Sequence, residues 1–108
     1  MSPRVLGFAT ASVLDAIRRG RRYGLDIIDE TGLGGGSVYK LLHRLEERGM
    51  IRGSWEEAEV AERERRPRRR YYRVIPDGER ALADALRRYG ALAARAGAPG
   101  GRAQPEEG

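Results

Sequence analysis

The sequence predicts a mainly α-helical fold with a small β-ribbon: a winged helix-turn-helix followed by a C-terminal dimerisation helix. Amphipathic helical segments fill the first half of the chain, two strand-like segments flank a highly charged stretch, and one further helical repeat follows Pro76. A chain of 108 residues has room for one small domain and an extension. We therefore expect a winged domain over 5–75, a helix over 76–96 and a disordered tail over 97–108.

The first three helices are predicted from the spacing of apolar residues. Between residues 5 and 17 these recur three and four positions apart, which indicates one buried helical face. A shorter helix is expected at 23–30. Residues 31–36 contain four glycines and predict a turn, which a third helix follows over about 37–48. The buried face of this third helix is expected to consist of Val38, Leu41, Leu42 and Leu45.

Two short strands and a last helix are predicted after the third helix. Residues 50–55 follow a helix-ending glycine, and residues 69–75 are rich in tyrosine and β-branched side chains, as strands are. A polar stretch separates the two, and Trp55 is expected to pack at the base of the ribbon. Pro76 suits the first turn of the last helix.

The last helix carries the apolar spacing of a coiled-coil seam. On a monomer this stripe would be exposed to water, because the helix is expected to lie outside the small winged domain. A second copy of the chain would cover it. The predicted dimer contacts are Leu82, Leu86, Tyr89, Leu92 and Ala93.

The composition argues against several classes of function. The chain has no cysteine and a single histidine, His43, so it offers no thiolate nucleophile and no thiolate metal site. Nothing around His43 resembles a catalytic triad, and we expect neither an enzyme nor a bound metal or cofactor. No long apolar segment predicts a signal peptide or a membrane span, so we expect a cytoplasmic protein.

The charge balance favours a polyanionic partner. The chain has 21 basic and 16 acidic residues, a formal net charge of +5. Six of the nine residues over 65–73 are arginines, placed where a wing would meet a DNA backbone. The preceding segment, 56–64, is acidic. It is expected to point away from DNA, or to fold back onto the arginines when DNA is absent.

The exposed face of the third helix fits double-stranded DNA. In a winged helix-turn-helix this helix enters the major groove. The residues expected to supply base and phosphate contacts there are Ser37, Lys40, His43 and Arg44. Taken alone, such a face also fits the solvated side of a core helix, and it is the arginine-rich ribbon that favours the interpretation as a DNA-binding surface.

Four blocks of the sequence closely resemble the PadR family of bacterial transcriptional regulators: 23–27, 36–51, Trp55 and 68–74. The resemblance covers about residues 10–90 and fits the short form with a single C-terminal helix. It implies a homodimeric winged-helix repressor in which the C-terminal helix is the dimer contact. It also implies DNA backbone contacts by the residues that match the family's helix-three tyrosine and basic wing: Tyr39, Arg68, Arg69 and Arg70.

The sequence also departs from the family pattern. The family usually has serine and proline where Gly34 and Gly35 stand, proline at Lys40 and threonine at Ile75. Members that bind flat drugs stack them on aromatic residues of the terminal helix, where this chain offers only Tyr89. The identity of any small-molecule effector is therefore left open.

We predict a sequence-specific regulator that binds double-stranded DNA, acting as a homodimeric repressor on a palindromic operator. The alternative is a winged-helix protein-interaction module without specific DNA binding.

Overall fold

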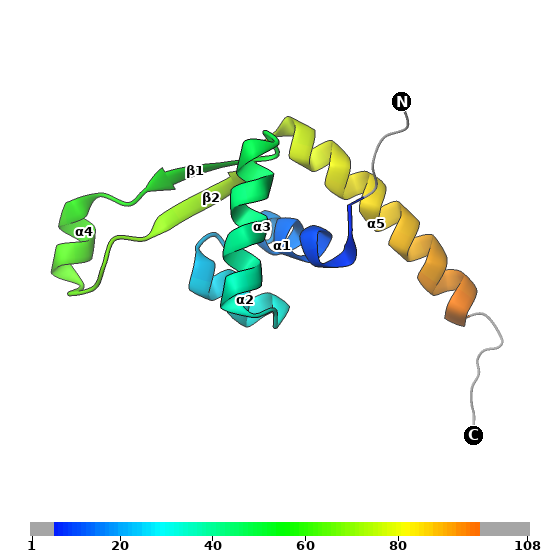
Figure 1. Ribbon diagram of the computed structural model, residues 1–108, viewed down its shortest axis with the longest axis horizontal. Helices are drawn as coiled ribbons and strands as arrows, with labels where there is room; N and C mark the ends of the chain where they lie inside the picture. The colour runs from blue at the N-terminus through cyan, green and yellow to red at the C-terminus, as the bar shows by residue number, and fades with distance from the viewer. Residues whose placement is uncertain (1–5, 98–108) are drawn as a thin grey trace, which may run out of the picture.

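The computed structural model describes residues 6–97. Of the tail expected over 97–108, Gly97 ends the last helix and residues 98–108 lie outside the described range. The chain has five helices and a two-stranded antiparallel sheet within the described residues. Three helices form the centre, while the sheet and the last helix project from it to opposite sides (Figure 1). This arrangement confirms the predicted winged helix-turn-helix with a long C-terminal helix.

The centre is built by α1 (Phe8–Arg18), α2 (Gly24–Thr31) and α3 (Gly35–Glu47). Each helix turns its apolar residues inward, and they meet in one cluster. Side chains that are almost completely buried in it include Val13, Leu14, Ile17, Ile27, Val38, Leu42 and Leu45. Burying such a side chain contributes about 1.5–3 kcal/mol, so this cluster fixes how α3 is presented to solvent.

The glycine run between α2 and α3 is more ordered than the sequence suggested. Gly32 ends α2 in the left-handed conformation, with φ of 73°, which glycine adopts without strain. Helix α3 then begins at Gly35, two residues before the predicted start. Gly34 caps it with extended backbone but without a side-chain hydrogen bond. Two glycines thus occupy the first turn of α3.

The wing is formed by β1 (Ile51–Trp55) and β2 (Arg70–Val74), which pair from Ile51 opposite Val74 to Trp55 opposite Arg70. Between them lies α4 (Ala58–Arg63), in the stretch predicted to be a loop. A backbone hydrogen bond attaches the wing to the core: the Tyr72 N–H donates to the Arg22 carbonyl oxygen over 2.8 Å.

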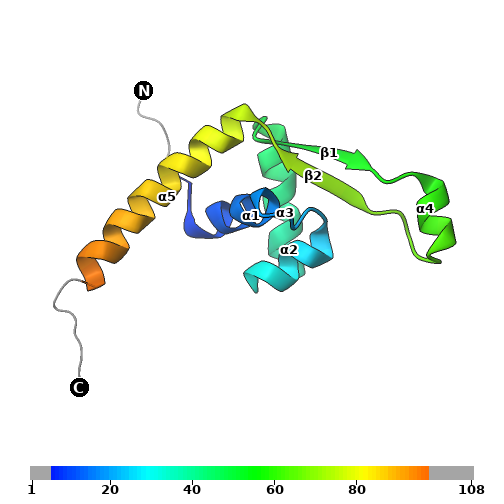
Figure 2. The same cartoon turned by 180° about the vertical axis from the view of Figure 1, so that it is seen from behind.

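Helix α5 (Pro76–Gly97) leaves the base of the wing and runs away from the core (Figure 2). Gly78 is buried where α5 crosses the start of the wing, and a Cβ at this position would collide with the Met50 carbonyl oxygen. Glycine is therefore required for this close approach. The helix continues through Gly90 and ends at Gly97.

The dimer contacts predicted on α5 are wrong for the first part of the helix. Leu82 is only 1% exposed and belongs to the protomer's own core, so it cannot contact a second chain. Tyr89 is half-buried against its own chain, and its hydroxyl donates a hydrogen bond to the Leu6 carbonyl oxygen over 2.7 Å. A helical stripe predicts that one face is apolar, but not what covers it. Here the first turns of α5 pack on α1 of the same chain.

Candidate nucleic-acid interface

The exposed face of α3 carries every side chain that the sequence predicted there. Because Val38, Leu42 and Leu45 point into the core, the opposite side of the helix faces solvent. The exposed residues on it are Ser37, Tyr39, Lys40, His43 and Arg44. Among residues 6–97, no carboxylate forms an ion pair with Lys40 or Arg44. Both positive charges are therefore available to a ligand.

Tyr39 is placed on this face by a contact between α3 and α2. Its phenol ring lies against the backbone of Gly24, at a position where any Cβ would collide with the ring and its hydroxyl. The glycine at the start of α2 therefore decides where Tyr39 lies. The ring remains half-exposed.

The wing is organised around one carboxylate, Glu56, which directly follows β1. Arg66 binds it with both terminal nitrogens, Nη1 to Oε1 at 2.7 Å and Nη2 to Oε2 at 2.8 Å. The Arg69 N–H adds a third hydrogen bond to Oε1 at 3.2 Å. The Glu56 side chain is 6% exposed, so this paired contact ties the two ends of the wing loop together in a site shielded from water.

The electrostatics of Glu56 follow from these contacts. The hydrogen bonds from Arg66 lower the pKa of its carboxyl to about 2, against the opposing effect of burial. The same pair raises the pKa of Arg66 above its usual range. The acidic segment thus does fold back onto the arginines, as one of the two predicted alternatives. Its Glu56 carboxylate pairs with the guanidinium group of Arg66 and not with those of Arg68 or Arg69.

The three arginines predicted to hold DNA have different surroundings. Arg68 donates through Nε to the Glu56 carbonyl oxygen at 2.9 Å, and Arg69 stacks on the Tyr23 ring at 4.0 Å. Neither is paired with a carboxylate in the part of the chain that the structure describes. Arg70, in contrast, forms an ion pair with Glu46 of α3 at 2.7 Å. Two of the three wing charges are therefore free of acidic partners.

A cavity of about 380 Å³ lies between the wing, α3 and the start of α2. It is lined by Tyr39, by Trp55 and by the guanidinium groups of the wing. Trp55 was expected to pack at the base of the ribbon. This expectation is wrong, because Trp55 stands at the outer end of β1 and is 58% exposed, with Arg70 5.4 Å from its ring.

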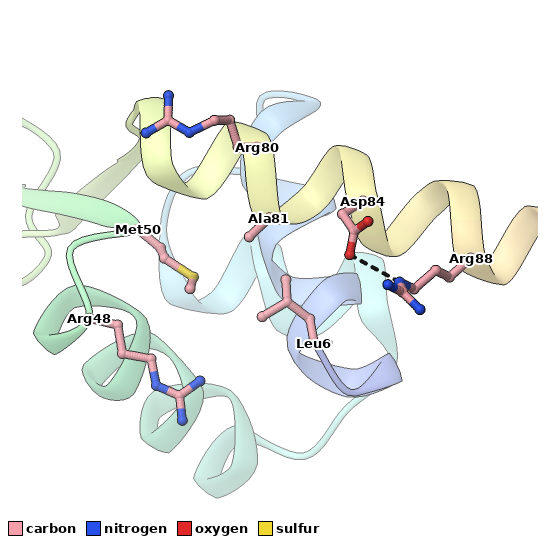
Figure 3. Close-up of a pocket in the computed structure, with 7 residues that line it drawn as sticks. All are labelled: Leu6, Arg48, Met50, Arg80, Ala81, Asp84 and Arg88. Carbon is pink, nitrogen blue, oxygen red and sulfur yellow. Dashed lines mark hydrogen bonds and ion pairs between the residues drawn. The ribbon is translucent and has the colours of Figure 1, made fainter. Parts of the chain in front are cut away.

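A second, more open cavity of about 710 Å³ lies on the side of α5 (Figure 3). Its apolar floor is made by Leu6, Met50 and Ala81. Arg48 approaches from the end of α3, while Asp84 holds Arg88 through an ion pair of 3.1 Å on α5. The cavity is of the size that small-molecule sites have, but its residues do not specify a ligand.

Sequence reasoning missed the residues that organise the wing. Glu46 and Tyr23 were not predicted to take part, and Glu56 was not singled out within the acidic segment. Glu46 and Arg70, for example, lie 24 positions apart in the chain. One signal was present. Gly53 interrupts a strand, which often marks a close approach by another group, and the Arg70 guanidinium does lie over it.

Within residues 6–97, no three His, Cys, Asp or Glu side chains gather as a metal site would require. The described helices also include none that is long and apolar enough to cross a membrane.

A three-helix core whose third helix stands exposed beside a two-stranded wing defines the winged helix-turn-helix class. The family model described as the transcriptional regulator PadR-like family matches residues 13–84. This range covers more than half of the chain, which therefore belongs to the PadR-like family. Its members are DNA-binding transcriptional regulators and not enzymes.

Solved structures of PadR-like regulators share this fold. A PadR family regulator from Clostridium difficile R20291 superposes with a TM-score of 0.70 at 18% identity, covering 81% of this chain and 92% of that one. A PadR-like regulator from Bacillus cereus gives 0.67 at 21% identity, covering 82% and 86%. At these identities the likeness shows the fold. No curated protein matches the chain.

Larger regulators share the fold as well. PcaV from Streptomyces coelicolor, solved in complex with its natural ligand, gives a TM-score of 0.75 at 18% identity and covers 92% of this chain. The chain spans 66% of PcaV, and it spans 59% of a MarR family regulator from Rhodococcus sp. RHA1.

Proposed function

We propose that the chain is a cytoplasmic repressor that binds a roughly palindromic DNA operator as a homodimer. The observation that carries the proposal is the position of Tyr39. Its side chain lines the cavity beside the wing arginines, and it also borders the surface that contains Lys40, His43 and Arg44. The two basic regions that the sequence predicted separately therefore adjoin each other, so one duplex could contact both.

In this proposal α3 enters the major groove and the wing holds the backbone. Lys40 and Arg44 are long enough to reach base edges, and Ser37 and His43 can donate to bases or phosphates. Tyr39, Arg68 and Arg69 would contact the sugar-phosphate backbone, which positions a protein on DNA without reading its sequence.

The test is a titration of the protein with a duplex from its own upstream region and with a random duplex at the same salt concentration. We propose that the operator lies upstream of the chain's own gene, so a specific repressor is expected to prefer the first duplex by about 10³-fold or more. Equal affinity for both duplexes would contradict the proposal and would favour a protein-interaction module that kept the fold.

The dimer is proposed to form through the outer part of α5 and the start of α1. Leu86 and Leu92 are 43% and 53% exposed, and Ala93 lies beside them on the helix. Phe8, which is also exposed, packs edge-on against Tyr89 with ring centroids 5.7 Å apart. These side chains extend the predicted stripe onto α1. A second copy would remove them from water.

Leu86→Glu tests this interface, because two unpaired carboxylates would enter the contact between protomers. The variant is expected to sediment as a folded monomer and to bind the operator like a single half-site. Ala91→Glu adds the same charge at an exposed position on another side of α5 and should remain dimeric. A dimer that survives Leu86→Glu would place the interface elsewhere.

A further inference from the structure

We propose that Glu46 and Arg70 are positioning residues that fix the wing to α3, and that Arg70 is not itself a DNA contact. The inference rests on the proposed DNA binding and adds to it the device that sets the geometry of the interface. It changes the role of one residue that the sequence and the family resemblance place on DNA.

One carboxylate joins three elements of the fold. Oε2 of Glu46, near the end of α3, accepts a hydrogen bond from Nη2 of Arg70 on β2 at 2.7 Å. The same oxygen accepts the N–H of Gly53 on β1 at 3.3 Å. Both strands are thus attached to the helix that is proposed to enter the major groove.

Arg70 is held in place by its surroundings as well as by its charge. Its guanidinium lies over Gly53, where an added Cβ would come within 2.7 Å of Nε. The rings of Trp55 and Tyr72 lie 5.4 Å and 5.8 Å from its Cζ. A guanidinium that faces aromatic rings and pairs with a carboxylate would lose these contacts if it turned to a phosphate.

A two-stranded ribbon alone is only marginally stable in water, and this wing projects well beyond the helical core (Figure 1). Its base is fixed by the Ile75 N–H, which donates to the Met50 carbonyl oxygen at 3.1 Å. Glu46 adds a restraint farther out along the strands. With this restraint, Arg68 and Arg69 keep a constant distance from the exposed face of α3.

A double-mutant cycle with Glu46→Ala and Arg70→Ala tests the inference. Each single variant is expected to weaken operator binding about tenfold, and the double variant should be no weaker than either, because both changes break one contact. If Arg70 instead contacted DNA and Glu46 competed for it, Glu46→Ala would tighten binding. Tighter binding, unchanged binding or additive losses would each overturn the inference.

A charge exchange between positions 46 and 70 provides a second test. It distinguishes an ion pair with Glu46 from a direct contact between Arg70 and DNA. Glu46→Arg and Arg70→Glu should each weaken binding, and combining them should restore most of the affinity. If Arg70 bound a phosphate, a glutamate at position 70 would repel DNA whatever stood at position 46, and no recovery would follow. Glu47→Arg, one residue along α3, controls for the attraction of DNA by any added positive charge.

Amide exchange without DNA separates this inference from the proposed function. The Gly53 N–H is expected to exchange faster in Glu46→Ala than in the parent protein, and at the parent rate in Glu47→Ala. Failure of the parent protein to prefer its own upstream duplex would refute the proposed operator binding and leave this result standing. Unchanged exchange at Gly53 would refute the restraint itself.

Discussion

The wing and the exposed face of α3 are both basic, yet their charges are arranged in opposite ways. On the wing, Arg66 and Arg70 are paired with Glu56 and Glu46, and their guanidinium groups are mostly covered. On α3, Arg44 is exposed and has no carboxylate partner among the described residues. The number of arginines in a segment therefore indicates neither how much positive charge is available to DNA nor where that charge lies.

The largest expected effect is on sequence preference and comes from α3. Arg44→Ala should cost about 1–3 kcal/mol of binding to the operator and much less on random DNA, because a contact to a base edge is lost. Competition titrations with both duplexes measure the two losses. Arg19→Ala, at the end of α1, is the control for a lost surface charge. Equal losses of affinity on both duplexes would show that Arg44 does not contact base edges.

A smaller effect, uniform over sequences, is expected from the unpaired wing arginines. Replacing Arg68 and Arg69 together by alanine should weaken binding to every duplex by the same factor. It should also reduce the slope of log affinity against log salt by about 2 per protomer, as two phosphate contacts are lost. Titrations at several salt concentrations give the slope. A slope that stays at the parent value would mean that these side chains do not touch phosphates.

Still smaller is the effect of pH on the wing loop. The pKa of Glu56 is about 2, below its ordinary value of 4.5, so the fold stabilises the ionised form. That contribution is complete above pH 4.5 and is lost as the pH falls toward 2. Amide exchange in α4, corrected for intrinsic rates, should therefore be constant from pH 7 to 5 and rise below about pH 4.

Glu56→Gln is the matched variant for this measurement. It should loosen α4 already at neutral pH and remove the rise at low pH, because position 56 no longer carries a carboxylate that pairs with Arg66 and can be protonated. Constant protection of α4 down to pH 2 in the parent protein would show that the ion pair with Arg66 does not hold the loop.

The smallest expected effect is on the start of α3. Gly34 has φ of −66° and ψ of 151°, and the space around it is open, so serine fits there without strain. Gly34→Ser should stabilise the protein by a few tenths of a kcal/mol by bonding a free N–H of the first turn. Thermal unfolding, and slower amide exchange over residues 37–40, measure this gain.

Gly34→Ala is the control, since it adds a Cβ without the hydroxyl. Alanine is a poor cap, and this variant should be less stable than the parent protein. If serine and alanine had the same effect, the missing cap would not limit the stability of α3.

The parts of the fold that sequence predicted well are those set by local spacing. The stripe of Val38, Leu42 and Leu45 determines which side of α3 is buried, and hence which side carries Lys40 and Arg44. Helix α4 escaped prediction because it has only six residues and no apolar stripe. The charged residues Glu57, Glu59 and Glu62 instead favoured the prediction of a solvent-exposed loop.

The parts that sequence could not predict depend on contacts between distant segments. Leu82 was placed in the dimer seam because its spacing matches that of Leu86, yet it packs on the core of its own chain. Arg68, Arg69 and Arg70 are adjacent in sequence and equal in charge. The third differs from the first two because its guanidinium group pairs with Glu46, which lies on another element.

The close contact at Gly78 makes the far end of α5 sensitive to small changes at its base. At this glycine the helix lies directly against the Met50 backbone, between α3 and the wing. Helix α5 has 22 residues and is about 33 Å long, so a tilt of about 5° at its base moves its far end by about 3 Å. In a dimer joined through the outer turns, that displacement would change the distance between the two α3 helices. The tolerance for different operator spacings would then be set at a position that touches neither DNA nor the second protomer.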